Sequence, residues 1–357
     1  MIADELHQKL LNEKESFPDI LGQYKVKHNL KSALLMGRHV VILGPPGIGK
    51  TTLAKNIAKL LPTITVNDCG YHCSPENPMC PMCLQSEAQK HKIKTKQLPG
   101  EERFIRIQGS PDLSAEDLLG DIDPVKAIKY GALSLEAFTP GKIFKANNGI
   151  LFFDELNRAP EKLQNALLQA LEEGKITIGS YDVDFAVNFI FIATMNPKDA
   201  TTERLADVLL DRFDMLYMGY PETVQIEMQI VKSKGKKIDI GFPENLIHYI
   251  ITFIHELRDN KNLEQVPSVR ASIGLYERSQ SNALLKKHQQ VTLDDIKEVI
   301  ESVIPHRIKL KPSVKLLSDP SKFVKQELEK FSEKYKNLKE TSRNNELDDL
   351  DSEEDST

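Results

Sequence analysis

A glycine-rich loop near the start of the chain has the composition and spacing of a phosphate-binding loop. The eight residues from Gly44 to Thr51 match the pattern G-x-x-x-x-G-K-[ST], and they stand between an apolar run and a helical one. Glycines let backbone N–H groups turn inward around phosphate oxygens, and the positive end of the following helix favours the same anion. We expect Lys50 to reach the β- and γ-phosphates of ATP and the Thr51 hydroxyl to bind Mg²⁺. The predicted nucleotide-binding residues of this loop are Gly44, Pro45, Pro46, Gly47, Ile48, Gly49, Lys50, Thr51 and Thr52.

Two adjacent acids stand at the end of a second apolar run. Asp154 and Glu155 follow residues 150–153, whose sequence Ile-Leu-Phe-Phe is typical of a buried strand. An apolar strand that ends in two acids is a Walker B pattern. In that pattern Asp154 holds Mg²⁺ through water, and Glu155 polarises the water that attacks the γ-phosphate. The alternative is an acidic strand end that faces solvent, and the pairing with the phosphate loop favours the catalytic interpretation.

Two later polar residues extend this candidate catalytic set. Asn196 follows the apolar run 188–193, where an amide would lie beside the γ-phosphate and help to orient water. Arg212 precedes a further apolar run, and an arginine there would stabilise transition-state charge on a nucleotide held by a neighbouring subunit. For each of the two residues, ordinary loop chemistry is the alternative.

These residues need a scaffold, and the sequence predicts one of the α/β class. Short β-rich runs alternate with helical patterns as far as about residue 220, which is typical of βαβ units and a parallel sheet. Several runs are apolar throughout, as strands covered on both faces should be. The expected strands are residues 40–43, 64–66, 104–108, 150–153 and 188–193. We therefore predict a P-loop NTPase parallel sheet sandwiched by helices over residues 1–220.

The pattern after residue 220 is helical only. Pro243 suits the first turn of a helix with a broad apolar stripe, Pro267-Ser268 begins another helix, and Thr292 caps a third. We predict a small all-α lid domain over residues 221–311.

Residues 312–357 are assigned to an amphipathic helix and an acidic, disordered tail. The apolar residues of 321–340 follow a short heptad spacing. We favour packing of this helix on its own lid over a coiled coil, because two heptads rarely sustain one.

Charge and composition exclude several classes of protein. The net charge is −5, but residues 344–357 hold seven acidic groups and no basic ones, so the body is near neutral and argues neither for nor against nucleic acid. With 40% apolar and 28% charged residues, the chain is not collagenous, wholly disordered or membrane-embedded. No apolar run approaches the roughly 20 residues of a spanning helix. The first residues lack a signal-peptide apolar stretch, so we expect a cytoplasmic protein without membrane insertion.

All four cysteines fall within fifteen residues, at positions 69, 73, 80 and 83. Two short spacings put pairs of thiolates on two turns, and the loop between them can fold all four into one tetrahedron. We predict a structural Zn²⁺ site within an insertion at residues 68–103. An iron–sulfur cluster, free thiols or a redox pair are the alternatives. The predicted ligands are Cys69, Cys73, Cys80 and Cys83.

A basic run, Lys90–Lys96, follows the cysteines. Zinc knuckles with basic flanks often touch nucleic acid, so DNA or RNA contact is a possible function of this segment. Only Tyr71 offers a base-stacking aromatic nearby, and we therefore favour a solvated loop face, with a protein-docking surface as the next choice.

Taken in order, these motifs resemble those of AAA+ ATPases over roughly residues 17 to 310. Residues 17–23 look like the segment that lines the adenine pocket. Asn196 looks like sensor 1, Arg212 like the arginine finger, and Arg270 like sensor 2. Within that superfamily the closest resemblance is to the MoxR and magnesium-chelatase ATPase-subunit group, which is carried by the strings IQGSPDL, DLLG, FTPGKIFKA, DELNRAP, QNALLQALEE and ATMNP.

The resemblance implies an ATP-hydrolysing motor. It implies a homo-oligomeric, hexameric ring with ATP and Mg²⁺ at subunit interfaces, and a partner that carries a von Willebrand A domain or is a chelatase-like large subunit. Its task would be chaperone-like maturation or metal insertion. A non-hydrolysing scaffold is disfavoured because the catalytic set is complete.

Two insertions mark the group: residues 121–139 would interrupt a helix, and residues 175–185 would form a hairpin before sensor 1, with Gly179-Ser180 near its turn. Arg158 and Arg204 would reach across the subunit interface, with surface salt bridging as the alternative. The cysteine insertion and the acidic tail depart from the family pattern.

Overall fold

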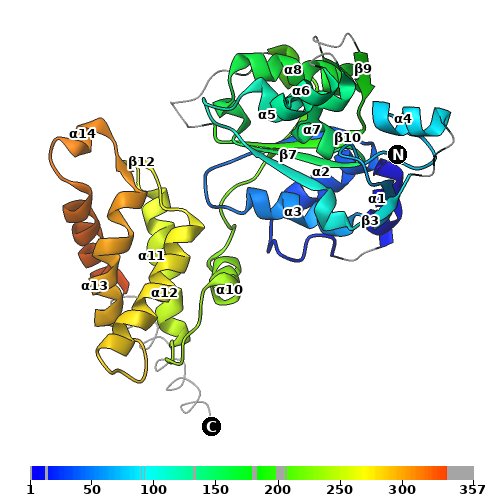
Figure 1. Cartoon of the computed structure of the whole chain (residues 1–357). Helices are drawn as coiled ribbons and strands as arrows, with labels where there is room; N and C mark the ends of the chain where they lie inside the picture. The colour runs from blue at the N-terminus through cyan, green and yellow to red at the C-terminus, as the bar shows by residue number, and fades with distance from the viewer. Residues whose placement is uncertain are drawn as a thin grey trace. The chain divides into compact units, whose positions relative to one another are not determined.

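The chain divides at the point where the alternation of strands and helices stops. The computed structural model forms two units, Met1–Gly219 and Tyr220–Thr357, and each is considered by itself (Figure 1). In the described part of the chain no helix has the length and apolar character needed to cross a bilayer. The structure describes residues 2–12, 15–89, 91, 93–131, 134–178, 183–197, 205 and 207–335.

Five parallel strands form the main sheet of the first unit, in the order β11-β1-β10-β7-β4. The central strands β1, β7 and β10 are buried along almost their whole length, because helices cover both faces of the sheet. The parallel α/β sheet that the sequence predicts is therefore confirmed. The strands are β1 (His39–Leu43), β4 (Phe104–Gln108), β7 (Gly149–Asp154), β10 (Phe189–Met195) and β11 (Phe213–Tyr217).

The prediction that residues 64–66 join this sheet is wrong. They lie in β2 (Ile64–Asn67), which pairs antiparallel with β3 (Thr95–Leu98) to form a separate ribbon. Such a short strand carries no sequence signal that tells a sheet strand from a ribbon strand. The fifth place in the sheet is taken by β11, which begins directly after Arg212.

Two helical layers cover the sheet, and alternate residues of each strand point into one or the other. Figure 1 shows the two groups of helices on opposite sides of the strands. On one side, Val40 and Ile42 of β1 pack against α1 (Ile2–Asn12), α2 (Tyr24–Leu35) and α3 (Lys50–Leu60). On the other side, Val41 and Leu43 pack in the cluster formed with α5 (Ala115–Leu119), α7 (Lys142–Lys145) and α8 (Glu161–Glu173). The period-two pattern of buried strands thus builds both halves of the core.

The two expected insertions appear as small β structures on this framework. Strands β5 (Gly120–Ile122) and β6 (Phe138–Pro140) pair antiparallel around α6 (Pro124–Tyr130) and η2 (Leu135–Ala137). Strands β8 (Lys175–Ile178) and β9 (Val183–Ala186) pair as a hairpin, and the expected turn at Gly179-Ser180 lies outside the described residues. The remaining short elements of the unit are α4 (Pro81–Ala88), η1 (Gly100–Arg103), η3 (Leu156–Arg158) and α9 (Asp207–Leu210).

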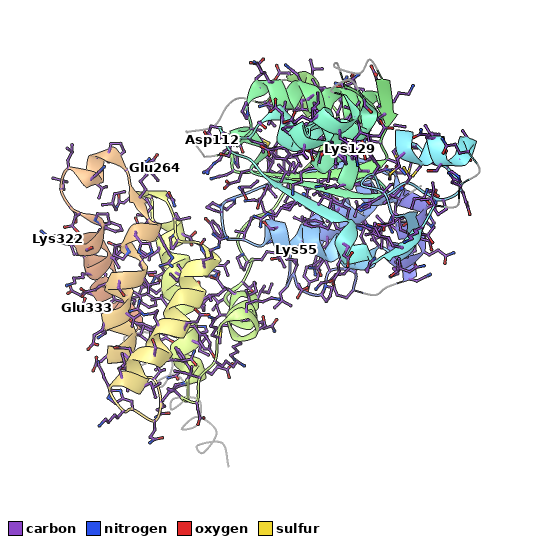
Figure 2. The ribbon with its side chains drawn as sticks, in the orientation of Figure 1. Lys55, Asp112, Lys129, Glu264, Lys322 and Glu333 are labelled. Carbon is purple, nitrogen blue, oxygen red and sulfur yellow. The ribbon has the colours of Figure 1, made fainter. Side chains whose placement is uncertain are left out.

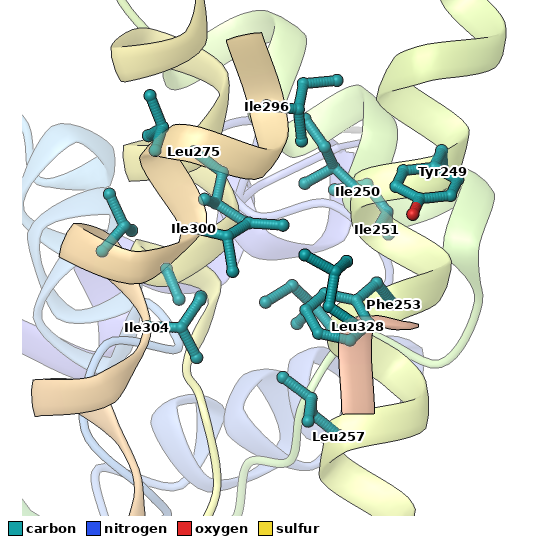
Figure 3. Close-up of a cluster of buried hydrophobic side chains, with 14 of the residues drawn as sticks. Tyr249, Ile250, Ile251, Phe253, Leu257, Leu275, Ile296, Ile300, Ile304 and Leu328 are labelled. Carbon is teal, nitrogen blue, oxygen red and sulfur yellow. The ribbon is translucent and has the colours of Figure 1, made fainter. Parts of the chain in front are cut away.

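The second unit is helical, with one small exception. Strands β12 (Leu263–Gln265) and β13 (Lys309–Leu310) pair antiparallel, and they are too short to leave a periodic signal in the sequence. Figure 3 shows side chains of several helices meeting in one core, among them Phe253, Ile300 and Leu328. The helices are α10 (Val224–Lys234), α11 (Glu244–Asp259), α12 (Val269–Leu285), α13 (Leu293–Val303), η4 (Pro305–Arg307), α14 (Pro312–Lys315) and residues 320–335.

The helix at residues 320–335 belongs to this core. Phe323, Val324 and Phe331 are buried in the same cluster as α11 and α13, so the expected packing of this helix on the lid is confirmed. The acidic tail lies outside the described residues.

A buried charge network ties together the helices of the second unit. Glu227 on α10 is fully buried, and its two oxygens accept bonds of 2.6 and 2.8 Å from the Arg258 guanidinium on α11. His255 Nε2 lies 2.9 Å from the same carboxylate, and Ser272 on α12 donates to it. Burial by itself would raise the pKa of Glu227, but the hydrogen bonds from His255 and Arg258 outweigh it and lower the pKa to about 2. The network therefore requires an ionised Glu227.

We predict that Glu227→Gln lowers the free energy of unfolding of the second unit by about 3–5 kcal/mol, because Arg258 is left buried without its counter-charge. The pKa of Glu227 is depressed from 4.5, so its stabilising effect is complete above that value and is lost as the pH falls toward 2. Chemical denaturation, with hydrogen exchange of α10 to α12, measures the loss. Glu264→Gln is the control, since its pair with Lys309 is exposed and should contribute less than about 1 kcal/mol. Equal losses in the two variants would contradict the prediction.

Candidate nucleotide site

The phosphate loop lies between β1 and α3, as its sequence requires. Gly47 and Gly49 have φ angles of 77° and 101°, in the left-handed region that side chains disfavour. The Lys50 ammonium donates to the carbonyl oxygens of Gly44 and Pro45 at 2.6 and 2.8 Å. The loop thus places the Lys50 ammonium beside the N-terminus of α3, and both groups favour the phosphates of a nucleotide.

Asp154, at the carboxyl end of β7, connects this loop to the neighbouring strand. Its Oδ2 accepts from the Thr51 hydroxyl at 3.3 Å, and its Oδ1 accepts from the Thr194 hydroxyl at 2.6 Å. The carboxylate is nearly buried, and its Oδ2 atom contacts Thr51 in the first turn of α3. An acid and a hydroxyl in contact beside a phosphate loop are the oxygen donors that Mg²⁺ favours, so the residues present fit the metal of a Mg–ATP complex.

Glu155 is held in an unusual backbone conformation next to that carboxylate. Its φ is 58°, and its N–H donates to the Thr194 hydroxyl at 3.0 Å. A Cβ atom at Gly109 would stand only 2.1 Å from the Glu155 carbonyl oxygen, so this approach of β4 to the site needs glycine. The Glu155 carboxylate accepts from Gln108 at 3.1 Å and pairs with Arg158 at 3.2 Å. Both acids of the motif therefore have fixed positions.

Three residues of this site were not anticipated from the sequence. They are Thr194, which bonds to both acids, and Arg106 and Gln108 on β4. Arg106 donates to Asp154 Oδ2 at 2.6 Å and to Gln108 Oε1 at 3.0 Å. The alternation of Arg106 and Gln108 with Ile105 and Ile107 was a usable signal, because it puts both polar side chains on one face of the strand next to the carboxyl end.

Asn196 and Arg212, the other predicted catalytic residues of the first unit, make the following contacts. Asn196 follows β10, and its carbonyl oxygen accepts from Asn157 at 3.4 Å. Arg212 pairs with Glu172 near the end of α8 and donates to the Val208 carbonyl oxygen. It is therefore tied to α8 and α9 rather than to the phosphate loop.

Arg270 lies in the first turn of α12 and therefore belongs to the second unit. It lies near Arg307, whose pKa is lowered by burial and by the charge of Arg270. The start of α12 is thus a cationic site within the second unit. Arg204 lies outside the described residues.

The segment expected to line the adenine pocket lies against the phosphate loop. Phe17 is fully buried, and the Ile20 side chain comes within 3.3 Å of the place where a Cβ at Gly49 would stand. Asp19 pairs with Lys59 of α3 at 2.7 Å, and Gln23 donates to the Gly219 carbonyl oxygen at 3.0 Å. These contacts fasten the segment to α3 and to the end of the first unit.

The four cysteines form a separate buried cluster, in which all Sγ atoms lie within 4.8 Å of one another. Backbone N–H groups point at sulfur, from Cys80 to Cys73 Sγ at 3.3 Å and from Cys83 to Cys80 Sγ at 3.4 Å. Hydrogen bonds from Cys73 and Cys80 lower the pKa of Cys69, while burial raises the pKa of Cys83 to about 12. Four thiolates this close repel one another unless a cation lies among them.

The cysteine loop is anchored to the core by Tyr71, which lies between two of the cysteines in sequence. Its ring stacks on Phe185 of β9 at 6.0 Å and meets Phe144 of α7 edge-on at 5.4 Å. Asn147 donates to the Tyr71 carbonyl oxygen, and Asn148 donates to that of His72, each at 3.1 Å. The cysteine loop thus contacts the segment that leads into β7 and the hairpin of β8 and β9.

Comparisons with known proteins cover both units. The family model "ATPase family associated with various cellular activities (AAA)" matches residues 88–215, "AAA lid domain" matches 264–328, and "Magnesium chelatase, subunit ChlI" matches 16–74.

The relatives are distant and match over most of their length. A magnesium-chelatase subunit ChlI homolog of Methanocaldococcus jannaschii is 27% identical, over 90% of this chain and 91% of its own. The uncharacterized protein YeaC of Bacillus subtilis is 28% identical, over 80% of this chain and 81% of its own. A solved structure of a putative ATPase from Cytophaga hutchinsonii is 20% identical, with a TM-score of 0.41 over 92% of this chain and 94% of its own.

A phosphate loop after β1, two acids at the end of β7 and a helical lid define an AAA+ ATPase, an enzyme that hydrolyses ATP with Mg²⁺. Within that class, the ChlI family model and the two relatives support the group of MoxR and magnesium-chelatase ATPase subunits.

We predict that Thr194→Val lowers ATP turnover by about 10- to 100-fold, because both acids lose the hydroxyl that positions them. The new side chain has the same shape, so the stability loss should stay within about 1–3 kcal/mol. Phosphate release at saturating Mg–ATP measures the effect, and Thr194→Ser is the control that keeps the hydroxyl. Turnover equal to that of the unmodified chain in Thr194→Val would refute this role.

Proposed function

We propose that this ATPase works as a ring-forming motor that remodels or matures a partner protein, with ATP bound at the interfaces between subunits. The observation that carries the proposal is an inserted helix that exposes apolar side chains on the ATPase unit. On α6, Val125 is 77% and Ile128 is 89% exposed, and none of the helix's residues is buried. Apolar groups on an inserted helix fit contact with a protein better than contact with a polyanion.

The proposed chemistry is attack of water on the γ-phosphate. Lys50 and the backbone of Gly44 to Gly49 bind the phosphates, while Thr51 and Asp154 hold Mg²⁺, which supplies charge neutralisation when bound. Glu155 polarises the attacking water and Asn196 orients it. Arg212 acts on the nucleotide of the adjacent subunit, and Arg270 is the sensor 2 residue of the lid. The attachment of Arg212 to Glu172, on a different element from the two acids, supports action in trans.

The proposed partner is a protein with a von Willebrand A domain or a chelatase-like large subunit. The name of the Methanocaldococcus relative supports this choice, since it describes a homolog of a magnesium-chelatase subunit. The proposed ring is a hexamer. Chaperone-like maturation and metal insertion use the same motor and differ in the partner.

Nucleic acid is the weaker alternative. Of the basic run, Lys96 pairs with Asp68 at 3.4 Å and Ile93 packs on the cysteine cluster, while Lys90 and Lys92 lie outside the described residues. Turnover stimulated by DNA or RNA, and falling steeply with salt, would favour this alternative.

Structural Zn²⁺ at the four cysteines is part of the proposal. Zinc–sulfur bonds of about 2.3 Å in a tetrahedron place sulfur atoms roughly 3.8 Å apart, which is compatible with the observed cluster. Four ligands close such a site, so the metal would be structural rather than catalytic. Through Tyr71, it would support the surface formed by α7 and β9.

A mixing experiment tests the ring. We predict that Arg212→Ala and Glu155→Gln are each nearly inactive, and that mixing them restores part of the ATPase activity. Mixed rings contain interfaces where the intact Arg212 of one subunit meets the intact Glu155 of the next. Phosphate release measures the recovery, and light scattering measures the size of the assembly. The double variant Glu155→Gln/Arg212→Ala, mixed with Arg212→Ala, is the control that offers no complete interface. Absence of recovery in the first mixture would argue against action in trans.

A metal analysis tests the cysteine site. We predict that the purified chain contains one equivalent of zinc by mass spectrometry and that Cys80→Ser removes most of it. Replacement by Co²⁺ should give the visible absorption of a tetrahedral thiolate site. Met82→Leu, a change at an exposed position between two of the ligands, is the control and should keep the metal. Iron with sulfide-dependent visible absorption, or no metal at all, would contradict the zinc assignment.

A further inference from the structure

The edge strand β4 directs a cation onto the acid that is proposed to bind Mg²⁺. Arg106 Nη2 lies 2.6 Å from Asp154 Oδ2. The side chain of Arg106 is about half exposed, whereas that of Asp154 is 12% exposed. The guanidinium therefore approaches a nearly buried carboxylate from the solvent side.

The oxygen that Arg106 contacts is also the one that faces the phosphate loop. Asp154 Oδ2 accepts from Thr51 at 3.3 Å, while Asp154 Oδ1 is occupied by Thr194. A divalent cation between Thr51 and Asp154 would stand beside the guanidinium, and two cations at that distance repel each other. The hydrogen bond from Arg106 to Asp154 Oδ2 and the binding of a metal ion at that oxygen therefore weaken each other.

The geometry of β4 keeps Arg106 within reach of this oxygen. Gln108 pairs in register with Asp154, and Gly109 N–H donates to the Asp154 carbonyl oxygen at 2.7 Å. Arg106 and Gln108 lie on the same face of the strand, and Gln108 Oε1 accepts from Arg106 while Gln108 Nε2 donates to Glu155. The arginine is therefore oriented by a neighbour that also contacts the second acid.

We propose that Arg106 is a positioning residue that occupies Asp154 in the metal-free chain and competes with Mg²⁺ for it. The inference rests on the proposed role of Asp154 as a magnesium ligand. Only the arginine of this pair is half exposed, and the carboxylate keeps Thr51 and Thr194 as hydrogen-bond donors when the guanidinium is withdrawn. As a competitor, it sets the concentration of Mg²⁺ at which the nucleotide site becomes loaded and keeps the carboxylate neutralised when the metal is absent.

The test is the affinity of the ADP-bound full chain for Mn²⁺, measured by the loss of the free-ion electron paramagnetic resonance signal. Loss of one nearby positive charge in Arg106→Gln should tighten Mn²⁺ binding by about three- to tenfold. The Mg²⁺ concentration that gives half-maximal ATP turnover should fall in the same direction. Arg106→Lys keeps the charge and should bind Mn²⁺ like the unmodified chain.

Arg38→Gln is the matched control for Arg106→Gln. Arg38 pairs with Asp214 at 3.1 Å at the opposite end of the same sheet, and its removal should leave metal affinity unchanged. Asp154→Asn, measured in parallel, should weaken Mn²⁺ binding.

Unchanged or weaker Mn²⁺ binding in Arg106→Gln, with weakened binding in Asp154→Asn, would overturn the competition while leaving the metal site intact. Unchanged binding in Asp154→Asn would overturn the assignment of Asp154 and the competition together. Circular dichroism of each variant verifies that it is folded.

Discussion

The negative charge of one nearly buried carboxylate organises the first unit. Asp154 accepts hydrogen bonds from Thr51 of α3, Thr194 of β10 and Arg106 of β4, which lie in different parts of the chain. A charge removed from water is tolerated only with such partners. Parallel strands supply them, because their carboxyl ends meet at one edge of the sheet. The same edge carries the phosphate loop, so the interaction that stabilises the acid also places it beside the nucleotide.

The parts that depart from this framework are attached to it by specific contacts. The cysteine loop is held by Tyr71 in an aromatic group with Phe144 and Phe185, and by two asparagines that precede β7. The insertion around α6 leaves Val125 and Ile128 exposed to solvent, and Figure 2 labels Lys129 of the same helix. In the second unit, the buried charge of Glu227 links its own helix α10 to α11 and α12. The cysteine loop and the α6 insertion are therefore fastened to the first unit at points outside the contacts of Asp154 and Glu155.

The fold was predictable where the signal was long or chemically specific. The apolar runs of β1, β7 and β10, the phosphate loop and the two acids are each interpretable in isolation, and the structure places them as expected. Short elements were not predictable: β2 pairs in a ribbon instead of the main sheet, and β12 and β13 were missed, because strands of two to four residues have no usable periodicity. Thr194, Arg106 and Gln108 were overlooked in the site because their contacts join residues 39 to 48 positions apart.

The amino-acid sequence by itself determined the class of chemistry. The spacing of Gly47, Gly49 and Lys50 predicts a phosphate site, and the two acids after an apolar run predict a metal and a water beside it. It also determined that four cysteines would gather, because their spacing is short. Only the tertiary structure decided which side chains control the acids, since strand pairing sets those distances. It placed Arg106 on Asp154, Gln108 on Glu155, and Thr194 between the two acids.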